Sequence, residues 1–184
     1  MVRAGARFLL ALGLVLALLG LAPFQRVLGE VVGSAAARVL GLAMGRPVLH
    51  VVKSAPVWSL TEGRIGIGLP GQPSIELQIV EHVRNLALFV SIVVAVATVR
   101  GGRLLLVLGV GSGIVLLLDA LIVAAEAWEH LPGATPSGPV YQGLRVLETL
   151  HGSGGMFVAP VFLGAAAACA FLRPTGAARR HGFR

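Results

Sequence analysis

The hydrophobic positions of the chain fall into four long runs separated by polar segments. The runs cover Phe8 to Phe24, Val83 to Val99, Leu104 to Trp128 and about Gly154 to Leu172. A helix that crosses a bilayer needs ~20 mostly apolar residues, so each run predicts a spanning helix. The first run has the arginine-flanked start of a signal peptide, but Pro23 follows its small-residue exit, so we expect an uncleaved anchor.

The segment between the first two runs carries two different patterns. From Val27 to Ala43 the apolar residues recur with helical spacing, which predicts an amphipathic helix that continues from the first span or lies along the interface. The stretches "RIGIGL" and "SIELQIVEH" instead alternate apolar and polar positions around the turn sequence "PGQP". They predict a small antiparallel β meander that rests on the outer ends of the helices.

The spacing G-x-G-x-x-G occurs within this meander, at Gly66, Gly68 and Gly71. A dinucleotide-binding loop of this spacing requires a preceding strand, a following helix and an acidic residue ~20 positions further on. Pro70 lies inside the motif, and a turn and a second strand follow it. The glycines therefore predict a hairpin.

Composition and charge give the compartment and the orientation. Hydrophobic residues make up 56% of the chain and charged residues 12%, against about 25% charged in soluble domains, which indicates a membrane protein. Eight arginines lie in three short segments that contain no acid, namely Arg3 and Arg7, Arg100 and Arg103, and Arg173, Arg179, Arg180 and Arg184. The positive-inside rule places both termini and the 100–103 turn in the cytoplasm. These arginines account for the net charge of +7, so no nucleic-acid partner is expected.

The expected fold is therefore mainly α, a four-helix transmembrane bundle with an extracytoplasmic antiparallel β meander between the first and second spans. The expected segments are 1–24 (cytoplasmic N-terminus and first span), 25–82 (extracytoplasmic helix and meander), 83–99 (second span), 100–103 (cytoplasmic turn), 104–128 (third span), 129–153 (extracytoplasmic loop), 154–172 (fourth span) and 173–184 (basic cytoplasmic tail).

Asp119 interrupts the third run and needs a partner, since an unpaired Asp in hydrocarbon costs about 2.5–3.5 kcal/mol. Counting from the cytoplasmic turn, Asp119 lies ~22 Å up its helix and Asn85 ~21 Å up the preceding one, with Arg84 one residue higher. Equal depth on an antiparallel hairpin predicts a structural polar cluster in which Asp119 pairs with Arg84, directly or through Asn85.

Two further hypotheses concern the same end of the bundle. His82, Glu126 and His151, together with Asp119, could hold a metal ion on the outer face and make the protein a metal-dependent membrane enzyme, although no zinc-binding spacing such as H-E-x-x-H connects them. Asp119 could instead relay protons in a transport complex. The structural interpretation is favoured, and no metal, cofactor or catalytic residue is expected. Gly109 and Gly113, and "LGAAAACA" in the fourth run, provide small faces for close helix packing within the chain or with a partner.

The order of these parts resembles a known family. The stretch "VWSLTEGRIGIGL…SIELQIV", followed by "RNLALFVSIVVAVA", an arginine turn and a last span containing Pro160, is similar to the exosortase-associated integral membrane proteins of bacteria, notably the exosortase H-associated type. The resemblance implies a bacterial inner-membrane protein. It also implies an accessory role beside an integral-membrane enzyme of cysteine transpeptidase type, which would supply the catalytic Cys, Arg and His itself. The expected function is thus a non-catalytic accessory or assembly subunit whose partners are the lipid bilayer and another integral membrane protein.

Overall fold

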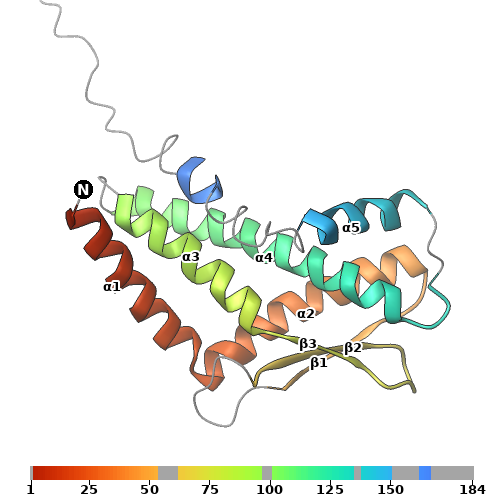
Figure 1. Ribbon diagram of the computed structural model, residues 1–184. Coiled ribbons are helices and arrows are strands. Elements are labelled where there is room, and N and C mark those ends of the chain that lie inside the picture. The colour runs from red at the N-terminus through yellow and green to blue at the C-terminus, as the bar shows by residue number, and fades with distance from the viewer. Residues whose placement is uncertain (1, 54–61, 97–100, 135–137, 151–161, 167–184) are drawn as a thin grey trace, which may run out of the picture.

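The computed structural model describes residues 2–53, 62–96, 101–134, 138–150 and 162–166. It is mainly helical, with one small sheet (Figure 1). In chain order the elements are α1 (Val2–Leu19), α2 (Ala22–Met44), β1 (Leu49–Lys53), β2 (Arg64–Gly68), β3 (Ile75–Gln78), α3 (Val80–Val96), α4 (Gly102–His130) and α5 (Pro139–Leu150). Residues 162–166 are also helical and are all that is described of the fourth predicted span.

A sharp corner separates α1 from α2, so the first helix ends before the predicted limit at Phe24. Pro23 occupies the first turn of α2, where a missing N–H is harmless, whereas it could not continue α1. The buried side chain of Gln25 fixes the corner, because its Nε2 donates a hydrogen bond to the Gly20 carbonyl at 3.0 Å. The helix predicted after the first span therefore exists as a separate element that sets off in a new direction (Figure 1).

The three strands form an antiparallel meander in the order β1-β2-β3, as predicted. The glycine motif lies in the β2–β3 hairpin. Gly71 has φ +75°, and Gln72 N–H donates to the Leu69 carbonyl at 3.1 Å. With Pro70 at the second position, this is a type II turn, which needs glycine at the third. The hairpin interpretation of G-x-G-x-x-G is confirmed.

The sheet packs on α2 at two glycines one helical turn apart. A Cβ added to Gly29 would lie 2.8 Å from Val52 Cγ1, and one added to Gly33 would lie 3.0 Å from Ile65 Cγ2. The absence of side chains at these positions lets the strands approach the helix backbone. The buried face of α2 repeats every three or four residues, which confirms that the helix is amphipathic.

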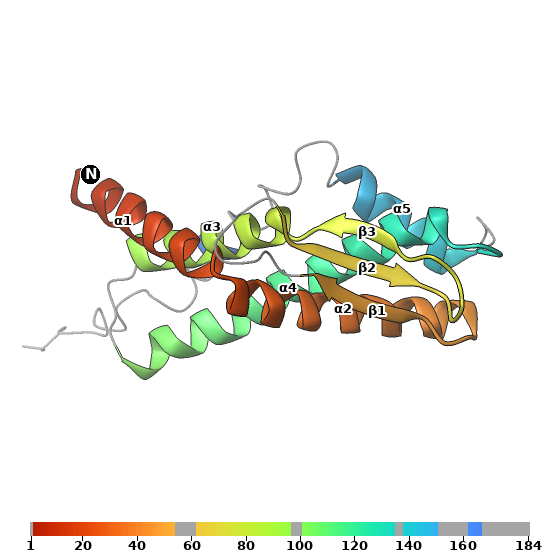
Figure 2. The ribbon, with the colours of Figure 1, turned by 90° about the horizontal axis from the view of Figure 1, so that it is seen from below.

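Two hydrophobic clusters divide the molecule along its length. The larger cluster joins α2, the sheet, the first turn of α3, α5 and the second half of α4. The smaller one joins α3 to the first half of α4 around Phe89, Val93, Val107 and Val115. Figure 1 and Figure 2 show the same division, with the sheet, α2 and α5 gathered at one end and α1, α3 and the start of α4 at the other. The long helix α4 runs through both.

Helices α3 and α4 cross at Gly111, where the Phe89 ring fills the space of the missing side chain. A Cβ on Gly111 would lie 2.0 Å from Phe89 Cζ. Gly109 and Gly113, the pair predicted to form a close-packing face, have no heavy atom of the described residues within 4 Å of the position a Cβ would take. Their face is therefore not used for packing within the described part of the chain.

Two helices, α2 and α4, are long and apolar enough to cross a membrane. For α4 this agrees with the predicted span 104–128, whereas α2 was predicted as an amphipathic helix outside the membrane. The other predicted spans give shorter elements, since the apolar part of α1 covers Ala4–Leu19 and α3 has 17 residues. Of the four predicted spans, only 104–128 therefore coincides with a described helix that is long and apolar enough to cross a membrane, and the second such helix, α2, lies in the segment predicted to be extracytoplasmic.

Helix α1 and the first half of α4 carry an extensive exposed apolar surface. The exposed fractions lie between 40% and 75% for Leu9, Leu10, Leu14, Leu18, Leu105, Leu106, Val110, Ile114 and Leu117. Soluble monomers seldom expose contiguous apolar patches beyond about 300–600 Å². The second half of α4 is different, because from Asp119 onward it is largely buried against α2 and α5.

Candidate functional site

A buried polar cluster lies where α3 and α4 pass each other. Asn85 and Asp119 each lie seventeen positions from Gly102, so an antiparallel hairpin that turns near Gly102 brings them to one level. His82 precedes Asn85 by three positions and therefore shares its helix face. All three residues are at most 3% exposed. The cluster lies about 26 Å along α4, at the boundary between its exposed and buried halves.

Asp119 accepts the one hydrogen bond of the cluster. Asn85 Nδ2 donates to Asp119 Oδ1 over 2.7 Å, and His82 Nδ1 lies 3.4 Å from the same oxygen. The second distance is within ion-pair range if the imidazole carries both protons. The predicted contact between Asn85 and Asp119 is confirmed, and His82, which the sequence analysis grouped with Asp119 only as a candidate metal ligand, is the second neighbour of this carboxylate.

Three atoms of the cluster have no hydrogen-bond partner among the described residues, namely His82 Nδ1, Asn85 Oδ1 and Asp119 Oδ2. Leaving a buried polar group unsatisfied costs about 1–3 kcal/mol. The cluster therefore holds the hairpin together through one hydrogen bond and retains unused donor and acceptor capacity. A water molecule or a proton could use that capacity.

The predicted ion pair of Asp119 with Arg84 is wrong, because Arg84 is exposed while Asp119 is 1% exposed. Successive residues of a helix are rotated by about 100°, so the face that points Asn85 at α4 turns Arg84 away from it. Equal depth along the two helices correctly predicted the level of the contact. Asn85 and His82, and not Arg84, lie on the face of α3 that points toward Asp119.

The predicted metal set is only partly placed. His82 is buried in the cluster, Glu126 is half-buried two turns further along α4, and His151 lies outside the described residues. Two helical turns correspond to about 11 Å, too far for Asp119 and Glu126 to share one ion. Within the described residues, no three His, Cys, Asp or Glu side chains come together as metal ligands.

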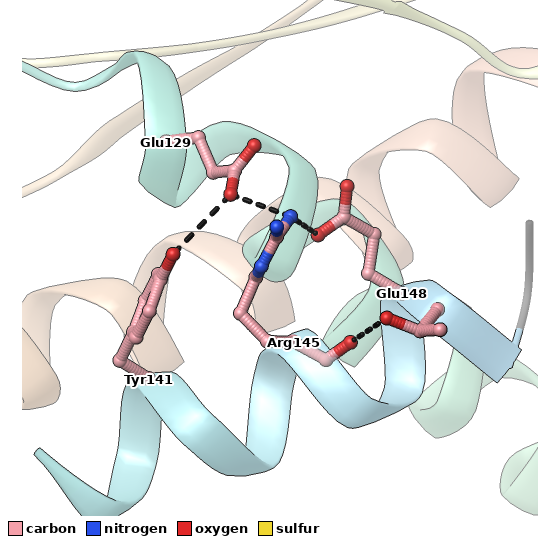
Figure 3. A network of polar contacts seen from close by, with 5 residues as sticks. Glu129, Tyr141, Arg145 and Glu148 are labelled. Carbon is pink, nitrogen blue, oxygen red and sulfur yellow. Dashed lines mark hydrogen bonds and ion pairs between the residues drawn. The ribbon is translucent and has the colours of Figure 1, made fainter. Parts of the chain in front are cut away.

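A second polar network fastens α5 to the end of α4 (Figure 3). Arg145 Nη1 lies 2.6 Å from Glu129 Oε1 and 2.9 Å from Glu148 Oε2, and the Tyr141 hydroxyl donates to Glu129 at 3.3 Å. The hydrogen bond to Glu148, followed by the attraction of Glu129, raises the pKa of Arg145 above its usual value. Unlike the buried cluster, these side chains are partly exposed.

This network was missed because residues 129–153 were predicted as a loop. The segment contains the amphipathic helix α5, whose buried Leu144 faces the core while Val140 and Val146 are exposed. Helix α5 has only 12 residues. Its aromatic contact is made with α4, where the ring of Trp128 lies 6.2 Å from the ring of Tyr141 between centroids, so it is not visible in the sequence of α5 alone. The spacing of Tyr141, Leu144 and Glu148 on one face is the signal that could have revealed it.

We expect α5 to depend on its apolar contact more than on its charges. Leu144→Ala should destabilise the docked helix by about 2–5 kcal/mol, the usual range for truncating a buried leucine. Arg145→Ala should cost at most about 1 kcal/mol, because ion pairs at exposed sites contribute little. Hydrogen–deuterium exchange of residues 139–150 measures both. Faster exchange in Arg145→Ala than in Leu144→Ala would contradict this ranking.

Comparison with known proteins gives no relative from which a role could be transferred. No protein-family model matches the chain, and neither a curated protein nor a solved structure matches it. The described residues form a mainly helical protein with a three-stranded antiparallel sheet and two helices that are long and apolar enough to cross a membrane.

Proposed function

We propose that this protein is a multi-pass membrane protein that acts as a non-catalytic accessory or assembly subunit of a membrane complex. The observation that carries the proposal is the distribution of exposed apolar side chains. Among the described residues, nine of them lie on α1 and the first half of α4 and four lie on α2, whereas the second half of α4 is largely buried against α2 and α5.

The dimensions of α4 support a membrane-embedded end and a projecting end. Its 29 residues span about 43 Å, against about 30 Å for the hydrocarbon core. Asp119, about 26 Å from the start of the helix, would lie near the outer boundary of that core. The folded module with the sheet would then stand outside the bilayer, as the distribution of arginines predicts.

The accessory role is supported by how the polar side chains are used. His82, Asn85 and Asp119 face one another in the packed interior, and the Arg145 network fastens α5 to α4. These contacts serve the fold. The exposed face of α4 around Gly109 and Gly113, by contrast, has no packing partner in the described part of the chain, which suits contact with another membrane helix.

The proposed partner is an integral membrane enzyme of exosortase type. This choice of partner rests on the order of the predicted segments along the sequence. Affinity purification of the tagged full-length chain from its native membrane is the direct test. We expect a second multi-pass protein to co-purify in a fixed ratio after mild detergent extraction. Recovery of this chain alone, under conditions that preserve other membrane complexes, would contradict the accessory role.

The proposed topology gives a separate prediction. Reporter fusions at residues 60, 102 and 184 should show the first outside and the other two in the cytoplasm, because the acid-free arginine segments flank the latter positions. Paired alkaline phosphatase and fluorescent reporters measure this. Phosphatase activity at residue 102 would exclude the proposed orientation of the α3–α4 hairpin.

A proton-handling role is the second candidate, because Asp119 Oδ2 and His82 Nδ1 are buried without hydrogen-bond partners among the described residues. Ionisable residues within spans often mark proton pathways. Asp119→Asn separates the two functions. A variant that keeps its partner and its thermal stability but loses function of the complex would favour the relay.

A further inference from the structure

A groove lined by basic residues lies between the end of α2 and the start of β1. Its volume is about 850 Å³. Its polar lining residues are Ser34, Arg38, Arg46 and His50, and the remaining lining consists of glycine, alanine, proline, leucine and valine. No acidic side chain lines the groove itself, although the Glu30 carboxylate lies 2.9 Å from Nε2 of the lining residue His50, so Arg38 and Arg46 are the permanent positive charges of the lining.

The two arginines differ in how they are held. Arg46 donates a hydrogen bond to the Pro132 carbonyl and is therefore fixed beside the groove. Arg38 is exposed and makes no hydrogen bond or ion pair within the described residues. Helix C-termini usually repel anions, but here the Gly41 carbonyl already accepts hydrogen bonds from the Gly45 and Arg46 N–H groups. The Gly41 carbonyl is therefore already hydrogen-bonded, and an anion in the groove would contact the guanidinium groups instead.

The groove opens beside an exposed apolar stripe of the same helix. Leu42, which lines the groove, is 86% exposed and lies one helical turn beyond Arg38. Val31 and Val27 are exposed on the same face nearer the start of α2, and Arg38 lies between them and Leu42. A positive groove next to an apolar stripe complements a molecule that has an anionic head and a hydrocarbon chain.

We propose that this groove binds the phosphate of an anionic phospholipid headgroup, with Arg38 and Arg46 as the groups that contact it. The inference rests on the membrane location in the proposed function and adds a ligand class to it. The acyl chains would lie along the Leu42 stripe, and α2 would be seated at the membrane surface.

The test uses the purified full-length protein in a neutral detergent, titrated with short-chain phosphatidylglycerol, phosphatidylcholine or inorganic phosphate. Native mass spectrometry and thermal shift report binding. We expect phosphatidylglycerol to bind most tightly, and Arg38→Gln to weaken it about fivefold, the effect of one basic residue near an anionic surface. Arg26→Gln is the matched control, because Arg26 is exposed on the same helix but does not line the groove. Arg38→Lys should retain more binding than Arg38→Gln.

Three results would overturn the inference. Equal weakening by Arg26→Gln would show general attraction to the helix, equal binding of phosphatidylcholine would remove the role of charge, and equally tight binding of inorganic phosphate would indicate a free-anion site. Carbonate extraction of membranes from the same strains separates this failure from that of the proposed function. Wild type and Arg38→Gln should both stay in the membrane pellet, whereas release of the wild type would contradict the membrane location itself.

Discussion

Replacing Gly111 with alanine is expected to lower the free energy of unfolding by about 1–3 kcal/mol, the usual cost of overpacking a filled core. The added Cβ would lie 2.0 Å from Cζ and 2.8 Å from both Cε atoms of the Phe89 ring. Phe89 is fully buried between α3 and α4, so relief requires the two helices to move apart. Thermal unfolding of the detergent-solubilised protein measures the loss.

Gly109→Ala and Gly113→Ala are the matched controls, since each glycine lies two residues from Gly111 on the same helix. Open space surrounds both positions, and alanine favours the helix over glycine, so stability should be unchanged or slightly raised. Phe89→Leu should remove part of the damage in Gly111→Ala, because the smaller side chain frees the space. Equal destabilisation by all three alanine substitutions would show that helix propensity, and not the Phe89 contact, decides the outcome.

The glycines at helix contacts show what the periodicity of hydrophobic residues can and cannot predict. The long apolar runs, the amphipathic α2 and the alternating strands were found because hydrophobic spacing directly reflects which face of an element is covered. Gly29, Gly33 and Gly111 give no such signal, since a glycine used for close approach has the same letter as one facing open space. Gly109 and Gly113 had the familiar small-residue spacing, yet the ring of Phe89 packs on the glycine between them.

The level of the polar cluster along α3 and α4 could be predicted from the sequence, but the side of α3 that faces α4 could not. Counting residues from the turn placed Asn85 beside Asp119, and the structure confirms that contact. The same count placed Arg84 at a similar height, and opposite charge made it the preferred partner. Which of two neighbouring residues faces α4 depends on how α3 is rotated by its packing on α1, and a single sequence does not contain that information.

The corner at Pro23 and the helix α5 were missed for a related reason. Both depend on the direction in which the chain continues after a helix ends. The hydropathy of a sequence window contains no information about that direction. Pro23 was considered only as an obstacle to signal cleavage, although its fixed φ also favours the start of a new helix there. In α5 the apolar positions are few, and they became informative only once α4 supplied Trp128 as a surface to cover.

Asp119→Ala is expected to lower the free energy of unfolding by about 1–3 kcal/mol, since it leaves the buried Asn85 amide without its acceptor. His82 would lose its only charged neighbour in the cluster at the same time. Arg84→Gln is the control, and it should change stability by less than about 0.5 kcal/mol because Arg84 is exposed. Chemical and thermal unfolding in detergent give both values.

The double variant Asp119→Leu with Asn85→Leu tests whether the two residues act as a pair. Replacing both partners of a buried hydrogen bond by apolar groups of similar size is often nearly neutral, whereas removing one leaves the other unsatisfied. We therefore expect the double variant to be more stable than either single one, with a coupling energy of about 0.5–3 kcal/mol. Strictly additive losses would show that the contact contributes nothing, and a loss in Arg84→Gln as large as in Asp119→Ala would restore the ion pair. Coupling confined to Asn85 and Asp119 would mean that a neutral amide, and not a guanidinium, keeps this carboxylate between the helices.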